Sequence, residues 1–523
     1  MKTIFLSNNI ITMEDNIHCN AILTENGIIK KVGTKEDILK LKDENTQIKN
    51  YEDNCLMPSF IDSHSHITAL AKSLLIANLS NAKNFDDIIN FLNEYKENNK
   101  IKEGEFLIGF GYDHNFLKEK KHPTKDILDK VSKEIPILIT HSSGHMCVVN
   151  TKALEILNIN KDTKDPIGGK IGRENGIPNG YLEESAFINN TKKCMNISIE
   201  KLMKSIKKAE RIYLQYGITT AQDGLTKYEE FNILKEMSKK NMLDIDVVSY
   251  VDIKNCKEII DENKEYLKYH NRYKIGGYKL FLDGSPQGKT AWMSKPYENE
   301  KEYRGYPIYK DSEVEHFVDT AINENIQIIT HCNGDSAADQ LIGAFKNKKA
   351  NIRPVMIHAQ TVRKDQLKEM SKIGMIASFF ADHIYFFGDI HLKNLGKRAF
   401  NISPIKSAIK NNVIYTIHED TPVVEPNILR SIWITLKRET KNGVILGEEE
   451  KISIEEALKA TTINAAYSYF EENEKGSIKE GKNADFIILD KNPLKVKNID
   501  EIQNINVLET IKNGKSIYKK INN

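Results

Sequence analysis

Two histidines separated by one residue, His64 and His66, follow a short apolar stretch at positions 56–61, with Asp62 behind them. Side chains alternate between the two faces of a strand, so His64 and His66 are expected to point the same way. Two bare imidazoles are costly to bury, but together they supply half of the ligands of a zinc site. The spacing therefore predicts one half of a metal centre.

Polar residues of metal-binding type also stand at the ends of later apolar stretches. In a (β/α)8 barrel, the carboxyl ends of all the strands meet on one face, so these side chains are expected to share one pocket. Imidazole and carboxylate ligands suit Zn, Fe, Mn or Co. The residues are Lys279 and Asp283 in or after 277–282, His331 and Asn333 after 326–330, His358 after 354–357, and His418 and Asp420 after 413–417.

The elements that must position these residues alternate between apolar strands and helical stretches. Such alternation is typical of βαβ units and a parallel sheet, and eight units make a closed TIM-like barrel. Helices are expected at 199–215, 314–324 and 364–373, and surplus strands such as 106–109 and 135–140 predict an insertion at about 80–200. The expected barrel strands are 56–61, 217–222, 245–251, 277–282, 326–330, 354–357, 375–379 and 413–417.

Both ends of the chain have the pattern of short strands joined by tight turns. The pairs Asn26-Gly27 and Asn513-Gly514 are strong hairpin signals. Because chain ends often lie close together, we expect one small β-sandwich domain built from both termini. The predicted domains are residues 1–55 as the first part of the sandwich, 56–470 as the metal-dependent barrel, and 471–523 as the second part of the sandwich.

The composition excludes several classes of function. The chain has 523 residues, of which 40% are hydrophobic and 28% charged, and its net charge is +2. This balance gives no reason to expect nucleic acid or an anionic membrane as a partner. Six scattered cysteines form no CxxC pair and no disulfide framework, and neither a signal peptide nor an apolar run of 18 residues is evident, so we expect a cytoplasmic protein.

Six segments, in the same order along nearly the whole chain, resemble the amidohydrolase superfamily, specifically its YtcJ-like branch (the amidohydrolase 3 family). The resemblance implies that His64 and His66 bind a first metal, and that His331 and His358 bind a second. It also implies that Asp420 contacts the first metal and the attacking water. The resembling segments are 57–66, 279–291, 330–335, 356–360, 418–423 and 476–485.

Further positions are candidates for a role in the site. Lys279 occupies the place where many relatives carry a carboxylated lysine that bridges two metals, and a buried lysine that loses its proton can capture carbon dioxide. His418 stands where many relatives have a small residue, so it is either a supporting residue behind the ligands or an extra ligand. His145, after the stretch 135–140, resembles a substrate-side segment and is a candidate substrate-binding residue together with Asp283 and Asn333.

The resemblance implies a metal-dependent hydrolase of carbon–nitrogen bonds other than peptide bonds. One or two divalent ions, with zinc favoured, would provide a bound hydroxide that attacks a linear amide or N-acyl compound, with Asp420 as the catalytic proton carrier. One alternative is a deaminase or cyclic-amide hydrolase that acts on a heterocycle. A second alternative is a non-catalytic barrel used for binding. The expected partner is a small-molecule substrate, and a homodimer is a candidate assembly because dimers are the commonest assemblies.

Overall fold

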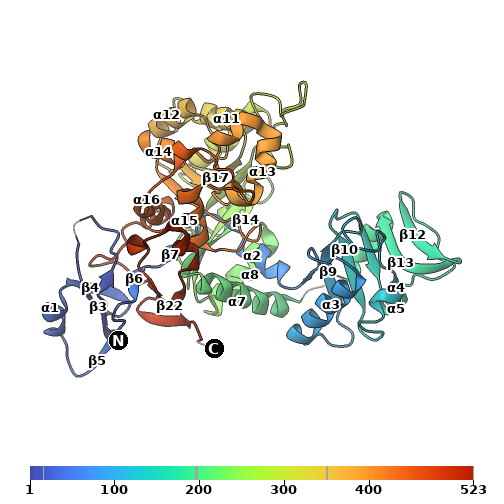
Figure 1. Cartoon of the computed structure of the whole chain (residues 1–523), viewed down its shortest axis with the longest axis horizontal. Coiled ribbons are helices and arrows are strands. Elements are labelled where there is room, and N and C mark those ends of the chain that lie inside the picture. Colours follow the sequence, from blue (N-terminus) through green and yellow to red (C-terminus); the bar gives the residue numbers. More distant parts are fainter. Residues whose placement is uncertain (16, 195–197, 349–350, 522–523) are drawn as a thin grey trace. The chain divides into compact units, whose positions relative to one another are not determined.

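The computed structural model describes residues 1–15, 17–194, 198–348 and 351–521 of the chain. It divides into two compact units (Figure 1). The first unit comprises Met1–Thr68 and Ala209–Asn523, and the second comprises Ala69–Lys208. The helices α2 (Ile67–Ser73) and α7 (Ile199–Gln215) run across the boundaries between the units.

A parallel sheet of eight strands forms the centre of the first unit. Its strands follow one another across the sheet in the order in which they occur along the chain. All seven neighbouring pairs are parallel, as expected for consecutive βα units. The strands are β7 (Phe60–Ile61), β14 (Ile218–Thr226), β15 (Asp246–Asp252), β16 (Tyr273–Phe281), β17 (Gln327–Cys332), β18 (Val355–His358), β19 (Ile376–Phe379) and β20 (Tyr415–Ile417).

Helices connect the strands of this sheet, and Figure 1 shows α11 to α14 grouped around β17. The three helices expected from the sequence are present as α7, α10 and α12. The connecting and following helices are α8 (Tyr228–Lys239), α9 (Glu258–Glu262), η1 (Lys264–Leu267), α10 (Asp311–Asn323), α11 (Asp335–Phe345), α12 (Lys364–Ile373), α13 (His383–Leu395), η2 (Gly396–Asn401), α14 (Ile405–Lys410), α15 (Ile428–Lys437), η3 (Glu448–Glu450), α16 (Ile454–Ala460) and α17 (Ile463–Ser468).

The segments that follow the first and last strands of the sheet are joined to each other. The backbone N–H of Asp420 donates to the carbonyl of His64 (3.2 Å), and that of His66 donates to Thr421 (2.8 Å). Apolar side chains from β7, β15, β17, β18 and β19 meet in one buried core. These contacts bring the two outer strands of the eight-stranded sheet together at their carboxyl ends, where the polar residues stand.

Two further sheets of the first unit come from the ends of the chain. They share a buried core that includes Phe5, Leu56 and Phe486, and the interpretation of the pair as a β-sandwich domain stays a prediction. The four-stranded sheet has the order β4 (Ile28–Gly33), β3 (Ala21–Glu25), β1 (Lys2–Leu6), β5 (Thr46–Asn50), and α1 (Lys35–Leu39) follows β4. The five-stranded sheet has the order β2 (Asn9–Ile10), β6 (Cys55–Pro58), β21 (Phe486–Leu489), β22 (Val507–Lys512), β23 (Lys515–Lys519), with η4 (Pro493–Lys495) and η5 (Ile499–Asn504) before β22.

The expectation of one continuous barrel strand over 56–61 is wrong. The chain forms two strands there, with β6 in the five-stranded sheet and β7 in the eight-stranded sheet. Ser59 lies between them and donates its backbone N–H to Asp485, while the next residue, Phe60, donates to Gly217. Both short strands are buried on both faces, so the run is apolar apart from Ser59, and the pair Pro58-Ser59 is the local sign of the change of sheet.

The second unit is built on a six-stranded mixed sheet with buried side chains on both faces. Ile137 and Ile139 belong to one core and Leu138 to the other, as the alternation of side chains along a strand requires. The predicted insertion at about 80–200 lies within this unit, although its residues 195–197 are outside the described ranges, and the predicted domain boundaries remain predictions. Its sheet has the order β12 (Gly169–Glu174), β13 (Ile177–Glu184), β11 (Met146–Val149), β10 (Ile137–His141), β9 (Leu107–Tyr112), β8 (Ala77–Asn78), and its helices are α3 (Phe85–Asn99), α4 (Lys125–Leu128), α5 (Thr151–Ile156) and α6 (Ser185–Cys194).

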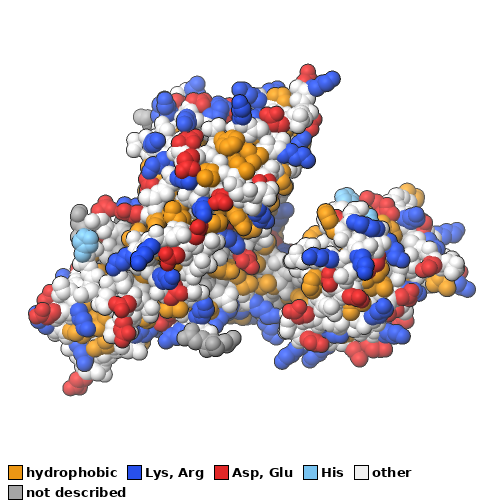
Figure 2. Space-filling model, in the orientation of Figure 1, with side chains coloured by type: hydrophobic (Ala, Val, Ile, Leu, Met, Phe, Trp, Pro, Cys, Tyr) orange, Lys and Arg blue, Asp and Glu red, His pale blue; other side chains and the backbone are white. Residues whose placement is uncertain are grey.

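The surface of each unit carries charges of both signs. Figure 2 shows the side chains of Lys and Arg interspersed with those of Asp and Glu over the visible face of the molecule. Among the helices in the described ranges, none is both long and apolar enough to cross a membrane.

Candidate metal centre

The predicted first metal pair, His64 and His66, lies after β7 and faces a carboxylate that follows β20. Asp420 Oδ1 is 3.6 Å from His64 Nε2 and 3.4 Å from His66 Nε2. These three ligand atoms lie within 4.8 Å of one another. Asp420 Oδ1 is buried and lacks a hydrogen bond of good geometry within the described part of the chain. A buried carboxylate oxygen between two imidazoles is the arrangement that a divalent cation satisfies, so this residue set fits a metal.

Gln222, in the middle of β14, fixes the orientation and the tautomer of His64. Its side-chain N–H groups donate to Ser63 O (2.9 Å) and to Tyr469 Oη (2.8 Å), which leaves its Oε1 as an acceptor for His64 Nδ1 (2.6 Å). The proton of the neutral His64 ring is therefore held on Nδ1 and the lone pair on Nε2. A hydrogen bond of this kind from the second ring nitrogen is the usual support of a metal-ligating histidine.

Gly224 explains why His64 fits against β14. A Cβ at position 224 would lie 2.5 Å from His64 Cε1 and 2.9 Å from His64 Nδ1. The absence of a side chain there lets the imidazole pack against the strand. Sequence reasoning missed both residues: Gln222 is the last residue of the predicted strand 217–222, and Gly224 lies in the part of β14 beyond it.

The predicted second metal pair, His331 and His358, comes from the neighbouring strands β17 and β18. His331 Nδ1 and His358 Nε2 face each other at 3.0 Å. The other nitrogen of His331, Nε2, lies 3.0 Å from Asn333 Nδ2 and 3.4 Å from Gly284 O, and Gly284 O would accept its proton if Nδ1 served as a ligand. The structure thus brings together two ring nitrogens that can converge on one ion.

His418 supports His358 from behind. Its Nε2 lies 3.3 Å from His358 Nδ1, and its own Nδ1 lies 2.8 Å from the hydroxyl of Ser378. If His358 presents the lone pair of Nε2 to an ion, its Nδ1–H donates to His418, and His418 in turn donates to Ser378. This geometry favours the supporting role for His418 over the role of an extra ligand.

Lys279, on β16, lies between the two histidine pairs. Its Nζ is 3.2 Å from His64 Nε2, and its side chain is buried. Burial lowers the pKa of the Lys279 ammonium group to about 7. A substantial fraction of the side chain is therefore the neutral amine near neutral pH, which is the form that carboxylation requires.

The electrostatics of the histidines match a cation site. Burial and the neighbouring Lys279 lower the pKa of His331 to about 4, and burial lowers that of His418 to about 3. Burial also holds the pKa of His64 well below its usual range. Burial alone would raise the pKa of Asp420, but contact with His66 holds it below its usual value. Neutral imidazoles around an ionised carboxylate are the protonation states that a metal requires.

Two of the predicted ligands have an unusual backbone conformation. His358 has φ of 74° and Asp420 has φ of 54°, both in the left-handed region that non-glycine residues seldom adopt. Such conformations persist where the surrounding structure enforces them, and they concentrate at functional sites. The backbone thus turns at the two positions where a ligand must point into the pocket.

The predicted substrate-binding residues Asp283 and Asn333 lie at the edge of the same site. The carboxylate of Asp283 accepts backbone N–H groups from Trp292, Asn333 and Gly334 at 2.7–3.0 Å, so it holds the loops that follow β16 and β17. Asn333 Nδ2 donates to Gly284 O (2.9 Å), whereas its Oδ1 is buried without a hydrogen-bond partner among the described residues. The roles of Asp283 and Asn333 in substrate binding stay predictions. Asn333 Oδ1 is an acceptor that could receive a hydrogen bond from a bound molecule.

His145 belongs to the second unit. Its side chain is exposed, and its Nδ1 lies 3.2 Å from Glu184 Oε1. Its assignment as a substrate-binding residue stays a prediction.

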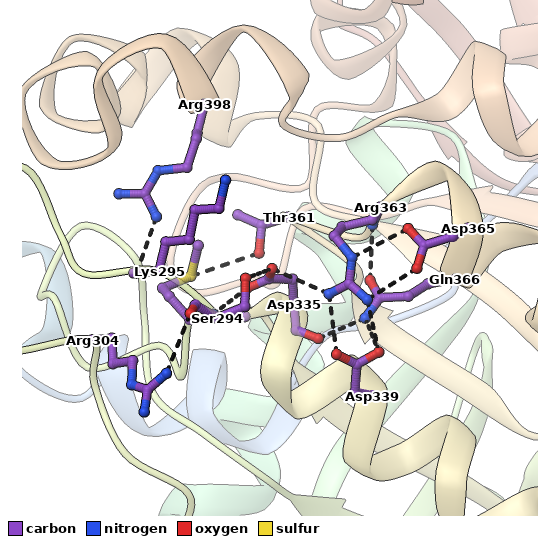
Figure 3. A network of polar contacts seen from close by, with 12 residues as sticks. Ser294, Lys295, Arg304, Asp335, Asp339, Thr361, Arg363, Asp365, Gln366 and Arg398 are labelled. Atoms are coloured by element: carbon purple, nitrogen blue, oxygen red, sulfur yellow. Dashed lines mark hydrogen bonds and ion pairs between the residues drawn. The ribbon is translucent and has the colours of Figure 1, made fainter.

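A network of charged side chains anchors the loop next to Asn333 (Figure 3). Asp335, at the start of α11, accepts hydrogen bonds from the backbone N–H and hydroxyl of Ser294, and it pairs with Arg363 at 3.2 Å. Arg363 also pairs with Asp339 (2.9 Å) and Asp365 (3.1 Å). A cavity of about 400 Å³ lies beside this network. The network ties the loop that contains Ser294 to α11 and α12.

Comparisons with known proteins identify the family of the chain. The Amidohydrolase family matches residues 50–518. YtcJ of Bacillus subtilis (strain 168) is 24% identical over 546 residues, covering 99% of this chain and 100% of that protein. The N-substituted formamide deformylase of Arthrobacter pascens is 23% identical, covering 99% of each chain. The crystal structure of an uncharacterized metal-dependent hydrolase from Pyrococcus horikoshii OT3 has a TM-score of 0.77 and 24% identity, covering 95% of this chain and 99% of that one.

This chain therefore belongs to the amidohydrolase family, in its YtcJ-like branch, as the sequence motifs predict. Its fold class is α/β with a TIM-like barrel.

Proposed function

We propose that this protein is a metal-dependent hydrolase that cleaves carbon–nitrogen bonds other than peptide bonds, and that its substrate is a linear amide or N-acyl compound. The observation that carries the proposal is the buried Oδ1 of Asp420, which lies 3.6 Å from His64 Nε2 and 3.4 Å from His66 Nε2. The substrate class is supported by the similarity to a relative named as an N-substituted formamide deformylase.

The residues that would hold metal ions form two sets. His64, His66 and Asp420 would hold the first ion, and His331 and His358 the second. Two imidazoles with a carboxylate suit zinc, which we propose as the ion. A divalent ion in such a site supplies Lewis acidity and activates water at neutral pH.

Lys279 would bridge the two sets after carboxylation. Its neutral amine nitrogen would form a bond to the carbon of carbon dioxide and release one proton, which yields an anionic carbamate. The low pKa of Lys279 and its contact with His64 Nε2 support this assignment.

Asp420 would carry the proton of the reaction. Its carboxylate is ionised at neutral pH, because its pKa is held below the usual value, so it can accept a proton from the reacting water through the oxygen that the ion would leave free. The same oxygen would then give the proton to the nitrogen of the leaving amine. Asn333 Oδ1, buried without a partner among the described residues, is available to accept a hydrogen bond from the amide N–H of a substrate.

The test is a substrate screen on the zinc-loaded full chain. N-substituted formamides and simple acyl amides are compared with cyclic amides and heterocyclic amines, and the released acid and amine are measured by mass spectrometry. We expect hydrolysis in the first group and loss of hydrolysis after chelation. Turnover of the heterocycles alone would move the assignment to the deaminase and cyclic-amide alternative, and a metal-free purified protein without turnover would favour the non-catalytic barrel.

The matched variant is Asp420→Asn. It keeps an oxygen near His64 and His66 but cannot accept a proton, so we expect metal binding to persist while turnover falls by about 10²- to 10⁴-fold, the usual contribution of a positioned acid–base group. Full turnover in this variant would refute the role of Asp420. A cytoplasmic location and a homodimeric assembly complete the proposal.

A further inference from the structure

A second group of metal-binding side chains lies in the unit Ala69–Lys208, on elements that have no part in the proposed reaction. The strands β9 and β10 are parallel neighbours, and His141 at the end of β10 is in register with Tyr112 at the end of β9. Asp113 and His114 follow directly after β9. The carboxyl ends of two parallel strands thus bring one carboxylate and two imidazoles to the same edge of this sheet.

The three ligand atoms are spaced as they would be around one ion. His114 Nδ1 lies 3.1 Å from His141 Nε2, Asp113 Oδ1 lies 3.4 Å from His141 Nε2, and Asp113 Oδ1 lies 3.9 Å from His114 Nδ1. Zinc bonds of about 2.0–2.1 Å in a tetrahedron place neighbouring ligand atoms about 3.3 Å apart. The observed distances between the three ligand atoms, 3.1–3.9 Å, are close to this value. An ion could therefore enter with small side-chain movements.

Neighbouring groups orient the three side chains. The hydroxyl of Ser142 donates to Asp113 Oδ2 (3.2 Å), and the backbone N–H of Asn115 donates to Asp113 Oδ1 (2.8 Å). The ring of His122 lies against that of His114, with centroids 4.1 Å apart. Supporting contacts of this kind hold the ligands of metal sites in place.

The position of the proton on the His141 ring determines which hydrogen bonds must change when an ion binds. The backbone N–H of Ser143 points at His141 Nδ1 (3.0 Å), so without an ion the ring carries its proton on Nε2 and donates it to His114 Nδ1. An ion at Nε2 would displace that proton, and Nδ1 would then donate to the hydroxyl of Ser143, which lies 2.9 Å away. Binding therefore moves the ring proton from Nε2 to Nδ1 without net release, and the backbone N–H of Ser143 loses His141 Nδ1 as its acceptor.

We propose that Asp113, His114 and His141 form a second metal site in this unit, with three protein ligands and an open fourth position. The class of ligand is a divalent transition metal ion such as zinc or cobalt, because two imidazole nitrogens with one carboxylate favour these ions over magnesium and calcium. His114 and Asp113 are partly exposed, with 30% and 22% of their side chains accessible, so an ion has a path into the site. The site does not depend on the proposed hydrolase activity.

The first experiment measures zinc binding to the full chain after removal of all metal by a chelator. The double variant His114→Gln/His141→Gln is compared with the wild type and with His316→Gln, a matched substitution at an exposed histidine on α10. Wild type and His316→Gln should each bind one zinc more per chain than the double variant. The zinc affinity of that site should fall by more than about 100-fold when both imidazoles are removed. Loss of only a hydrogen-bond partner of a metal ligand already lowers metal affinity by about 10- to 100-fold. Equal zinc content and equal affinity in all three proteins would overturn the proposal.

A second measurement uses the unaltered chain, in case the double variant does not fold. Histidines are carbethoxylated with and without zinc, and the modified positions are quantified by mass spectrometry. We expect zinc to slow the modification of His114 at least tenfold while that of His316 stays the same. An unchanged rate at His114 under saturating zinc would overturn the proposal without any substitution.

Discussion

Replacement of Gln222 by leucine tests the reasoning about how His64 is prepared for a metal. Gln222 Oε1 accepts the hydrogen bond of His64 Nδ1, and its amide N–H groups hold Ser63 O and Tyr469 Oη. Leucine has nearly the same volume but no polar atom. The variant therefore leaves a buried His64 N–H and a buried Ser63 carbonyl without partners, and it frees the imidazole to rotate and to change tautomer.

The size of the effect follows from the hydrogen bonds that the substitution removes. Loss of the partner of a metal-ligating histidine usually lowers metal affinity by about 10- to 100-fold, which corresponds to about 1.4–2.7 kcal/mol. Each buried group left without a hydrogen bond also lowers the free energy of unfolding by about 1–3 kcal/mol. Zinc affinity is measured by competition with a chromophoric chelator, and stability by urea denaturation of the metal-free protein.

The matched control is Gln327→Leu. Gln327 lies at the opposite end of the strands, at the start of β17, and makes three similar buried hydrogen bonds, to Tyr250, Arg353 and Ser468. This variant should lose comparable stability but keep its zinc affinity, because it contacts none of the proposed ligands. Equal zinc affinities for Gln222→Leu and the wild type, with both proteins folded, would refute the argument.

The other predictions concern charge and stability. Burial lowers the pKa of Lys279 from 10.5 to about 7. Between about pH 7 and pH 10.5, the Lys279 side chain therefore carries a proton in the unfolded chain that it lacks in the metal-free folded protein. The free energy of unfolding should therefore rise with pH in that window, relative to Lys279→Met, by up to about 1.4 kcal/mol per pH unit; parallel urea-denaturation curves for the two proteins would contradict this. Lys512→Met removes a buried ammonium group from two carboxylates, one of them Asp246 at 2.7 Å, and should cost about 3–5 kcal/mol in urea denaturation; a loss below about 1 kcal/mol would contradict the estimate. His418→Ser removes the acceptor of His358 Nδ1 and should weaken the second zinc by about tenfold in the same chelator competition, whereas the first zinc should be unaffected.

Residue type and period allowed the centre of the site to be predicted from the sequence. Chain order and the convergence of strand ends are enough to group His331, His358 and Asp420 at the carboxyl end of the sheet. The premise that His64 and His66 alternate along a strand is wrong, because β7 ends at Ile61 and both histidines lie in the segment after it. Seven of the eight expected barrel strands coincide with strands of the eight-stranded sheet to within a few residues. These features depend on local periodicity and chain order, which a single sequence carries.

Contacts between distant segments could not be predicted in this way. Gln222 is one polar residue within a strand, and only the fold shows that His64 is its partner, 158 residues away. The break at Ser59 has only the pair Pro58-Ser59 as a local sign, because both sheets bury the apolar run around it. Asp113 and His141 come together only through the parallel pairing of β9 with β10, and nothing in either local sequence specifies that pairing.

The position of β6 between β2 and β21 has a consequence for the order in which the chain is made. Pro58 pairs with Phe486, so about 430 residues must be synthesised before β6 gains its second neighbour. At about 5–20 residues per second, this delay is about 20–90 s. During that time an apolar strand edge, directly ahead of the first barrel strand, has no permanent partner and can pair with another nascent chain. Cells that produce this protein in quantity would therefore benefit from chaperones that shield the emerging chain until β21 arrives.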